Sequence, residues 1–309
     1  MKKTIITGNA HPALQQILTE KGYEVLYEPA ISYDEIKAKG NGVTGLILTT
    51  RIKVDKELID ALPQLQWIGR LGSGMELVDL PYAESKGILC VSSPEGNRNA
   101  VAEHLLGLAL MILNKMNVAI PQVKKGIWLR NENRGTELKG KTVGIIGFGN
   151  TGSSFARLLA PFEVTVLAYD KYKNGFAHDY IKEASLEQVC KYADLIAFCV
   201  PLTDETRYML NQNLLQQMQQ QPIILSACRG KVIDTDALIA GLKAQQIAGA
   251  CLDVLENEKL NTYTAAEKAR LDELLSFENV IVTPHIAGYS HEAFLKMVTV
   301  TLEKLAPRL

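Results

Sequence analysis

The sequence predicts an α/β protein built from two doubly wound parallel-sheet (Rossmann-like) domains, and three observations support this prediction. Short apolar runs of strand length alternate with helical segments almost throughout the 309 residues, a pattern typical of parallel sheets with right-handed crossovers. The strand-like runs form two series, separated by an apolar helical stretch near 99–113 and a polar loop at 124–140. A chain of this length is also long enough for two domains of about 100–200 residues each.

The individual elements are expected as follows. Strand candidates of the first series lie at 3–7, 23–27, 45–49, 66–68 and 88–91, and those of the second at 142–146, 163–169, 195–199, 222–227, 248–253 and 280–283. Helical segments are expected among others at 55–62, 99–113, 151–159, 186–193, 236–244, 265–275 and 290–305. The last helix is amphipathic, so we expect it to return and cover the first domain. The predicted domains are residues 1–98 plus 290–309, and residues 99–289.

Composition and charge narrow the class of function. A formal net charge of −1, with 47% hydrophobic and 22% charged residues, predicts neither a nucleic-acid nor an anionic-membrane partner. The longest apolar runs, such as 105–113, are shorter than the ~20 residues that a membrane span needs, so we expect no membrane segment. Five scattered cysteines without a C-x-x-C pair suggest small buried thiols in a reducing cytoplasm. The histidines and acidic residues show no metal-ligand spacing, and no metal is expected.

A glycine-rich turn predicts a dinucleotide site in the second domain. Gly147, Gly149 and Gly152 form a G-x-G-x-x-G pattern between a strand and a helix. The first glycine permits the tight turn, the second lets a pyrophosphate approach the backbone, and the third lets helix and strand pack closely. The next strand ends at Asp170, 18 residues after the last glycine (170 − 152). A carboxylate there accepts ribose hydroxyls and repels a 2′-phosphate, which favours NAD over NADP, although Lys171 and Lys173 weaken that preference.

Three ionisable side chains, Arg229, Glu258 and His285, follow strands of the same domain, where ligands of open parallel sheets bind. Taken singly, a charged side chain such as Arg229 or Glu258 is more often a solvent-exposed charge without a function. A single histidine is more often a structural residue whose hydrogen bonds are made within the protein. Together they suit the reduction of a 2-keto acid, which needs a proton on the carbonyl oxygen as hydride arrives. An imidazolium can donate that proton near neutral pH, an adjacent carboxylate favours the protonated imidazole, and arginine forks onto a substrate carboxylate.

Further motifs occur in order along the chain: SPEGN at 93–97, AVAEH at 100–104, ELKGKT at 137–142, PLTDET at 201–206, RGKVIDTDAL at 229–238 and TPH at 283–285. Over essentially the whole length, this series resembles the D-isomer-specific 2-hydroxy acid dehydrogenase family. The resemblance implies an NAD-dependent oxidoreductase with its active site in the cleft between the two domains, the first domain binding substrate and the second NAD.

The resemblance also implies residue roles. His285 would be the general acid–base, Glu258 its carboxylate partner, and Arg229 the anchor of the substrate's carboxylate and carbonyl. The NAD-binding residues would be Gly147, Gly149, Asn150, Thr151, Gly152, Asp170, Val200, Pro201, Thr206, Ala227, Cys228, Asp253 and Gly288, with Asp253 and the Cys228 main chain holding the carboxamide. The substrate-binding residues would be Arg51, Ser73, Gly74, Arg229 and His285. His104 is expected only to pack or cap its helix, and Cys228 lacks any sequence cue for a nucleophile.

Several segments depart from the family pattern, and these departures leave the identity of the substrate open. Glu76-Leu77 stands where Asp-Asn is usual, and Glu258-Lys259 with a long helical insertion replaces Glu-Pro. Overall similarity leans towards members that act on D-3-phosphoglycerate. Because the chain stops at Leu309, we expect the short form of these enzymes. Arg51 suits a substrate phosphate or, equally, a solvated basic turn, and glyoxylate, hydroxypyruvate and other small 2-keto acids stay open. An NAD(H)-sensing interaction protein and a formate- or phosphite-oxidising enzyme are less favoured.

The long apolar helix at 99–113 predicts a homodimer. Its apolarity exceeds what a one-sided amphipathic helix requires. We therefore expect this helix and the loop after it at a two-fold axis.

Overall fold

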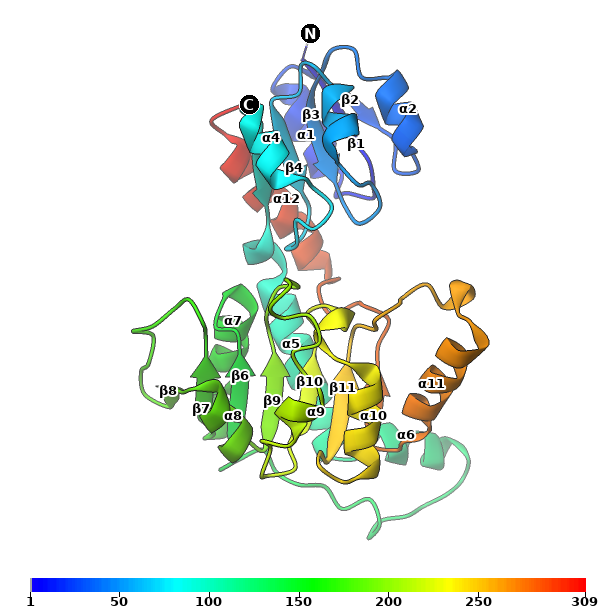
Figure 1. The fold of residues 1–309 in the computed structure, drawn as a ribbon, viewed down its shortest axis with the longest axis vertical. Helices are drawn as coiled ribbons and strands as arrows, with labels where there is room; N and C mark the ends of the chain where they lie inside the picture. Colours follow the sequence, from blue (N-terminus) through cyan, green and yellow to red (C-terminus); the bar gives the residue numbers. More distant parts are fainter. Residues whose placement is uncertain (1) are drawn as a thin grey trace. The chain divides into compact units, whose positions relative to one another are not determined.

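The computed structural model describes residues 2–309, which form two compact units (Figure 1). Unit 1 comprises the chain up to Asn99 together with Gly288–Leu309, and unit 2 comprises Ala100–Ala287. The sequence placed these boundaries after 98 and 289, so the two divisions differ by one or two residues. Each unit contains its own parallel sheet, and the predicted fold class is confirmed.

The sheet of unit 1 has five parallel strands in the order β2-β1-β3-β4-β5. The strands are β1 (Lys2–Ile6), β2 (Tyr23–Tyr27), β3 (Val43–Leu48), β4 (Trp67–Arg70) and β5 (Leu89–Ser92). The helices are α1 (Ala13–Glu20), α2 (Tyr33–Ala38), α3 (Lys56–Asp60), α4 (Leu80–Ser85) and α12 (His291–Leu305). Because α12 buries Val298, Leu302 and Leu305 against β4, β5 and α1, the last segment of the chain completes the core of the unit that begins it.

The sheet of unit 2 has seven parallel strands in the order β12-β11-β10-β9-β6-β7-β8. The strands are β6 (Thr142–Ile146), β7 (Thr165–Tyr169), β8 (Ile181–Glu183), β9 (Leu195–Phe198), β10 (Ile223–Ser226), β11 (Gly249–Leu252) and β12 (Val280–Val282). The helices are α6 (Met116–Lys124), α7 (Asn150–Leu159), α8 (Leu186–Tyr192), α9 (Gln212–Leu215), α10 (Thr235–Lys243) and α11 (Ala265–Ser276). The strand order reverses between β6 and β9, which creates the switch point at which such sheets bind ligands.

Helix α5 (Pro94–Leu113) differs from the sequence prediction in its first residue and in how far its apolar side chains are buried. It begins five residues earlier than the sequence indicated, and Val101, Leu105, Leu108 and Ile112 are buried in the core of unit 2. Most of its apolar length is therefore used inside the protein, while Leu106, Leu110 and Met111 are half-buried, and the place of this helix at a two-fold axis stays a prediction. The exposed apolar side chains lie further along, on α6 and the segment after it.

Several short elements escaped prediction, among them α1, α2, α4, α6, α9 and β8. Most run for fewer than three turns, where helical periodicity is hard to separate from loop sequence. Within residues 2–309 no single helix is long and apolar enough to cross a membrane; α5 and α6 meet that test only as a pair that bends by 67°.

Candidate active site

The turn between β6 and α7 has a space that suits a pyrophosphate. Gly147 has a φ of +95°, and a Cβ added there would lie 2.6 Å from the carbonyl oxygen of Cys199. A Cβ at Gly152 would lie 2.1 Å from the carbonyl oxygen of Gly147, so that helix and strand pack too closely for any side chain. A Cβ at Gly149 would meet nothing within 4 Å. The open glycine is the one at which phosphates approach, and the residues after it, Asn150 and Thr151, form the first turn of α7.

Asp170 follows β7 and folds back onto this turn. Its Oδ2 accepts a 2.8 Å hydrogen bond from the Phe148 backbone amide, and its Oδ1 accepts from the amides of Tyr172 and Lys173 at 2.9 and 3.1 Å. A carboxylate oxygen has two lone-pair sites. Oδ2 therefore keeps one acceptor position for a ribose hydroxyl, while Oδ1 is filled by the backbone.

An ion pair lies beside Asp170, and the sequence did not indicate it. Lys171 Nζ contacts Glu205 Oε1 at 2.6 Å, and the Tyr172 hydroxyl donates to Glu205 Oε2 at 2.9 Å. These bonds lower the pKa of Glu205. Lys171, one of the two cations that weakened the expected preference for NAD, is thus paired with a carboxylate 34 residues away in the chain, a contact that no local pattern reveals.

The loop after β9 contains the predicted Val200, Pro201 and Thr206. Val200 lies against the turn, since a Cβ on Gly147 would come within 2.9 Å of its Cγ1. The Thr206 hydroxyl donates to the carbonyl of Pro201 at 2.6 Å and accepts from the Thr203 amide at 2.8 Å. Thr206 therefore holds the shape of this loop.

Arg229 lies three residues beyond β10, and the glycine after it permits a close contact. A Cβ on Gly230 would lie 1.9 Å from the Leu255 carbonyl oxygen, so only glycine allows the segment after β11 to approach. This approach brings Glu258 into the electrostatic range of Arg229. The Arg229 Nη1 donates to the Cys228 carbonyl at 2.7 Å.

Glu258 and His285 are brought together from two different strands. His285 Nδ1 lies 2.9 Å from both carboxylate oxygens of Glu258, and both side chains are about two-fifths exposed (41% and 43%). Burial alone raises the pKa of Glu258, but the hydrogen bond and charge of His285, a backbone hydrogen bond at Leu255 and the charge of Arg229 lower it below its ordinary value. An ionised carboxylate only accepts hydrogen bonds, so Nδ1 carries a proton and Nε2 is the nitrogen that can exchange one with a substrate.

The segment from 283 to 287 holds His285 in an unusual backbone conformation. His285 has a φ of +57°, the left-handed region that few non-glycine residues adopt. Asp253, expected to contact the carboxamide, is only 1% exposed and accepts from the amides of Ile286 and Ala287 at 2.9 and 2.7 Å. Its carboxylate is therefore anchored to the segment that contains His285.

His104 is a residue whose surroundings the sequence did not indicate. It lies in the middle of α5, so it cannot cap that helix, and its Nε2 is 3.0 Å from the Thr283 hydroxyl and 3.6 Å from Asp253. Cys228, by contrast, has no sign of activation: burial raises the pKa of its thiol, although Ser226 and Arg229 act in the opposite direction. Ala227 lies between β10 and this cysteine, half-buried.

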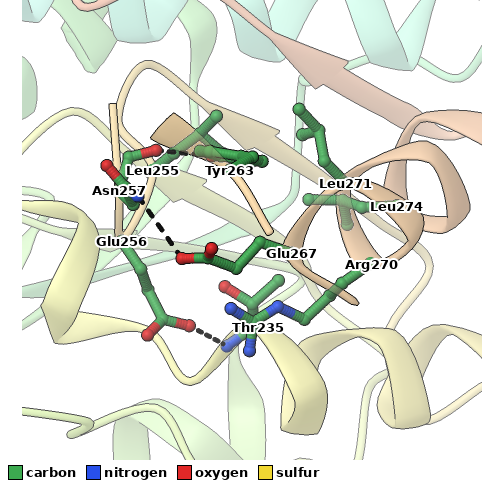
Figure 2. A pocket seen from close by; sticks show the side chains of 9 residues that line it. All are labelled: Thr235, Leu255, Glu256, Asn257, Tyr263, Glu267, Arg270, Leu271 and Leu274. Atoms are coloured by element: carbon green, nitrogen blue, oxygen red, sulfur yellow. Dashed lines mark hydrogen bonds between the residues drawn. The ribbon is translucent and has the colours of Figure 1, made fainter. Parts of the chain in front are cut away.

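The segment that leads from β11 to Glu258 surrounds a small cavity of about 20 Å³ (Figure 2). Glu256 accepts from the Thr235 amide at 3.0 Å, and the Asn257 side chain contacts Glu267 at 3.3 Å. The Tyr263 hydroxyl donates to the Asn257 carbonyl. Tyr263 and Glu267 belong to the insertion after Glu258, so the insertion holds Asn257, the residue before the glutamate.

In unit 1, the predicted substrate residues make contacts within their own unit. The Arg51 Nη2 donates to the carbonyls of Ile31 and Thr7 at 2.9 and 3.3 Å. The Ser73 hydroxyl donates to Asn97 at 3.0 Å, beside Gly74. Asn97 belongs to the SPEGN motif, and nothing in that motif indicated that its asparagine supports this loop. The same asparagine lies 2.9 Å from a Cβ built on Gly288, which belongs to this unit.

Comparison with known proteins agrees with this arrangement. Residues 106–287 match the family model of the D-isomer specific 2-hydroxyacid dehydrogenase NAD binding domain. D-3-phosphoglycerate dehydrogenase of Homo sapiens is 32% identical over 95% of the chain and 54% of its own length, and glyoxylate reductase of Pyrococcus furiosus is 32% identical over 95% and 88%. The chain thus spans about half the length of the phosphoglycerate dehydrogenases that it matches.

Solved structures show the same architecture. D-lactate dehydrogenase from Aquifex aeolicus, complexed with NAD and lactic acid, has a TM-score of 0.84 and is 27% identical, with coverage of 99% of this chain and 96% of that one. D-2-hydroxyisocaproate dehydrogenase has a TM-score of 0.85 at 25% identity, covering 99% and 96%.

Proposed function

Because the chain belongs to the D-isomer-specific 2-hydroxyacid dehydrogenase family, we propose that it interconverts a 2-hydroxy acid and a 2-keto acid with NAD as cofactor. The observation that supports this activity is the contact of His285 Nδ1 with both oxygens of Glu258, with Arg229 nearby. All three lie in unit 2, which also contains the glycine turn that leaves room for a pyrophosphate.

Each side chain has a task in keto-acid reduction. NADH, when bound, supplies the hydride. His285 donates the proton from Nε2 to the carbonyl oxygen, and Glu258 stabilises the imidazolium before that transfer. Arg229 neutralises the substrate carboxylate and aligns it through paired N–H donors. In the oxidation direction the neutral Nε2 accepts the proton from the hydroxyl group.

We propose D-3-phosphoglycerate and 3-phosphohydroxypyruvate as the substrate pair. Several relatives at 31–32% identity are named D-3-phosphoglycerate dehydrogenase. The guanidinium of Arg51 has five N–H donors, of which two are used on backbone carbonyls, so further donors can serve a phosphate. Glyoxylate is the alternative, favoured by the relative from Pyrococcus furiosus, whose length the chain covers to 88%.

An NADH-oxidation screen tests the activity and the substrate together. We would assay 3-phosphohydroxypyruvate, hydroxypyruvate, glyoxylate, pyruvate and 2-ketoglutarate and rank them by kcat/KM. The proposal expects the phosphorylated acid to rank first, and a higher rank for glyoxylate would assign the chain to the alternative. NADH binding without turnover of any acid would contradict the dehydrogenase activity and favour a sensing role.

We further propose that NADH is preferred over NADPH. Asp170 keeps one acceptor position for a ribose hydroxyl, and its charge repels a 2′-phosphate. Lys171, which would attract that phosphate, is paired with Glu205. Measuring kcat/KM with both cofactors tests the preference, and a ratio near one contradicts it.

A homodimer through unit 2 is also proposed, with α6 and the segment after it as the contact surface. This surface exposes the apolar side chains Met116, Ile120, Val123, Ile127, Trp128 and Leu129, and Trp128 is 80% exposed. Beside it, an open groove of about 670 Å³ is lined by α6 and by the residues between α11 and β12. A second copy would cover both the groove and the apolar segment by two-fold symmetry.

Light scattering at micromolar concentration tests the dimer. The wild-type chain should have twice the mass of 34.0 kDa, and Trp128→Ser should shift the mass towards that of one chain. Tyr172→Ser is the matched control, since Tyr172 is also 80% exposed but lies outside this surface. A wild-type mass of one chain refutes the dimer.

A further inference from the structure

Three hydrogen-bonded polar side chains, of which Asp253 is buried and His104 and Thr283 are half-buried, adjoin the segment that contains His285. Asp253 follows β11, Thr283 follows β12, and His104 comes from α5. The Thr283 hydroxyl donates to Asp253 Oδ1 at 2.5 Å, and His104 Nε2 lies 3.0 Å from the same hydroxyl oxygen. Asp253 is 1% exposed, so its charge is compensated almost entirely by these neighbours and by backbone amides.

The directions of these hydrogen bonds follow from counting protons. The Thr283 hydroxyl has one hydrogen, and that hydrogen is used on the Asp253 carboxylate. Towards His104 the hydroxyl oxygen can therefore only accept. His104 must carry a hydrogen on Nε2, which makes it a donor at the end of a chain that runs from His104 through Thr283 to Asp253.

The same carboxylate holds the His285 segment at three points. Besides the Thr283 hydroxyl, it accepts from the amides of Ile286 at 2.9 Å and Ala287 at 2.7 Å. His285 lies between these anchors with a φ of +57°, a conformation that persists only where its surroundings impose it. Without the anchors, the turn would relax towards ordinary backbone angles and move Nδ1 away from Glu258.

We propose that His104, Thr283 and Asp253 form a positioning network that imposes the left-handed turn at His285 and so holds its imidazole against Glu258. The proposal rests on the proposed dehydrogenase activity, in which His285 moves the proton. His104 and Thr283 act only through His285, so they are positioning residues. Because the Asp253 carboxylate at the end of this network is buried, the loss of one donor leaves it undersatisfied, and the effect on the turn is larger than that of a surface bond.

Substitutions at Thr283 separate positioning from packing. Thr283→Val keeps the volume and removes the hydroxyl, whereas Thr283→Ser keeps the hydroxyl and removes a methyl group. We expect Thr283→Val to lower kcat roughly 10–100-fold, in line with the cost of a misplaced catalytic group, while KM and NADH affinity change little. Thr283→Ser should recover most of kcat. Thr165→Val, at an exposed strand position of the same unit, is the matched control.

The activity measurement is paired with one that needs no turnover. In ¹H–¹⁵N NMR spectra, the Nδ1–H signal of His285 should be present in wild type, Thr283→Ser and Thr165→Val, and weakened in Thr283→Val. If the wild type reduces no keto acid but the signal follows this order, the proposed activity fails and the network stands. Equal losses of kcat in the valine and serine variants, or an unchanged valine variant, would overturn the network.

His104 provides the second test if Thr283→Val does not fold, as judged by circular dichroism and NADH binding. His104→Phe removes the donor while keeping a ring in the helix. We expect a smaller fall in kcat than for Thr283→Val, together with a smaller loss of the His285 signal. In the wild type, the ¹⁵N shifts of His104 should show a proton on Nε2; a ring with Nε2 unprotonated contradicts the assigned direction.

Discussion

The two units use the same kind of sheet and differ in how they treat their polar side chains. In unit 2, side chains that follow β11 and β12 contact one another, as His285 and Glu258 do. In unit 1, Arg51 donates to the backbone carbonyl of Ile31, and Ser73 donates to the side chain of Asn97. Reaction chemistry needs several groups in one fixed geometry, whereas substrate choice needs a few adjustable contacts. Changes in unit 2 should therefore affect every substrate, and changes in unit 1 should alter the ranking of substrates.

The largest effect should come from the proton donor. His285→Ala is expected to lower kcat by ~10²–10⁴-fold on every accepted keto acid, the usual value of a positioned general acid. NADH affinity, measured by fluorescence titration, should stay close to wild type because the glycine turn is untouched. A variant that loses activity on one substrate only would show that His285 selects substrates.

Arg229→Lys should have the second-largest effect on activity. Lysine keeps the charge but loses the paired donors, so kcat/KM should fall roughly 10–100-fold, the value of one or two charge-assisted hydrogen bonds. The fall should be similar for all keto acids, since each has the carboxylate. Steady-state kinetics with two substrates of different size checks this, and an unchanged kcat/KM would remove Arg229 from the anchor role.

Glu258→Gln should change the pH dependence more than the maximal rate. The pKa of Glu258 lies below its ordinary value, so the carboxylate is charged at every working pH and is neutralised only as the pH falls through that lowered pKa. The charge favours the imidazolium that reduction requires. Without it, the decline of kcat/KM at high pH should begin at lower pH. A pH profile with an unshifted basic limb would show that Glu258 is not the partner of His285.

Arg51→Ala tests whether a side chain of unit 1 determines the ranking of substrates. If Arg51 serves a substrate phosphate, kcat/KM for 3-phosphohydroxypyruvate should fall roughly tenfold while that for glyoxylate is retained. Lys21→Ala, which removes one exposed cation from the same unit, should leave the ranking unchanged. Equal losses of kcat/KM on both substrates would contradict the idea that unit 1 affects the choice of substrate and unit 2 the reaction itself.

The smallest effect should come from Glu205→Gln. This change removes an exposed negative charge and releases Lys171, so the ratio of kcat/KM for NADH to that for NADPH should fall several-fold. The change should shrink in high salt, since both groups are exposed. Glu187→Gln, at another exposed glutamate of unit 2, should leave the cofactor ratio as it is.

Local patterns in the sequence were sufficient for the architecture and for the glycine turn. Alternating strands and helices determine a parallel sheet, because consecutive parallel strands must be joined by crossovers. Gly147 and Gly152 were recognisable because their roles are steric and depend on neighbours a few residues away. The short elements α2 and β8 were not, since six and three residues contain too little periodicity.

Only the tertiary structure decided which polar groups meet. Lys171 with Glu205 and His104 with Thr283 are separated by 34 and 179 residues, and no spacing rule links them. The same holds for Asp253, whose place at the end of a strand was clear but whose bonds to Ile286 and Ala287 depend on the β11–β12 pairing. The sequence alone determined the fold and the class of chemistry, because both follow from short-range periodicity and residue type. How His285 is held was decided by packing, which brings distant segments to within a hydrogen bond of one another.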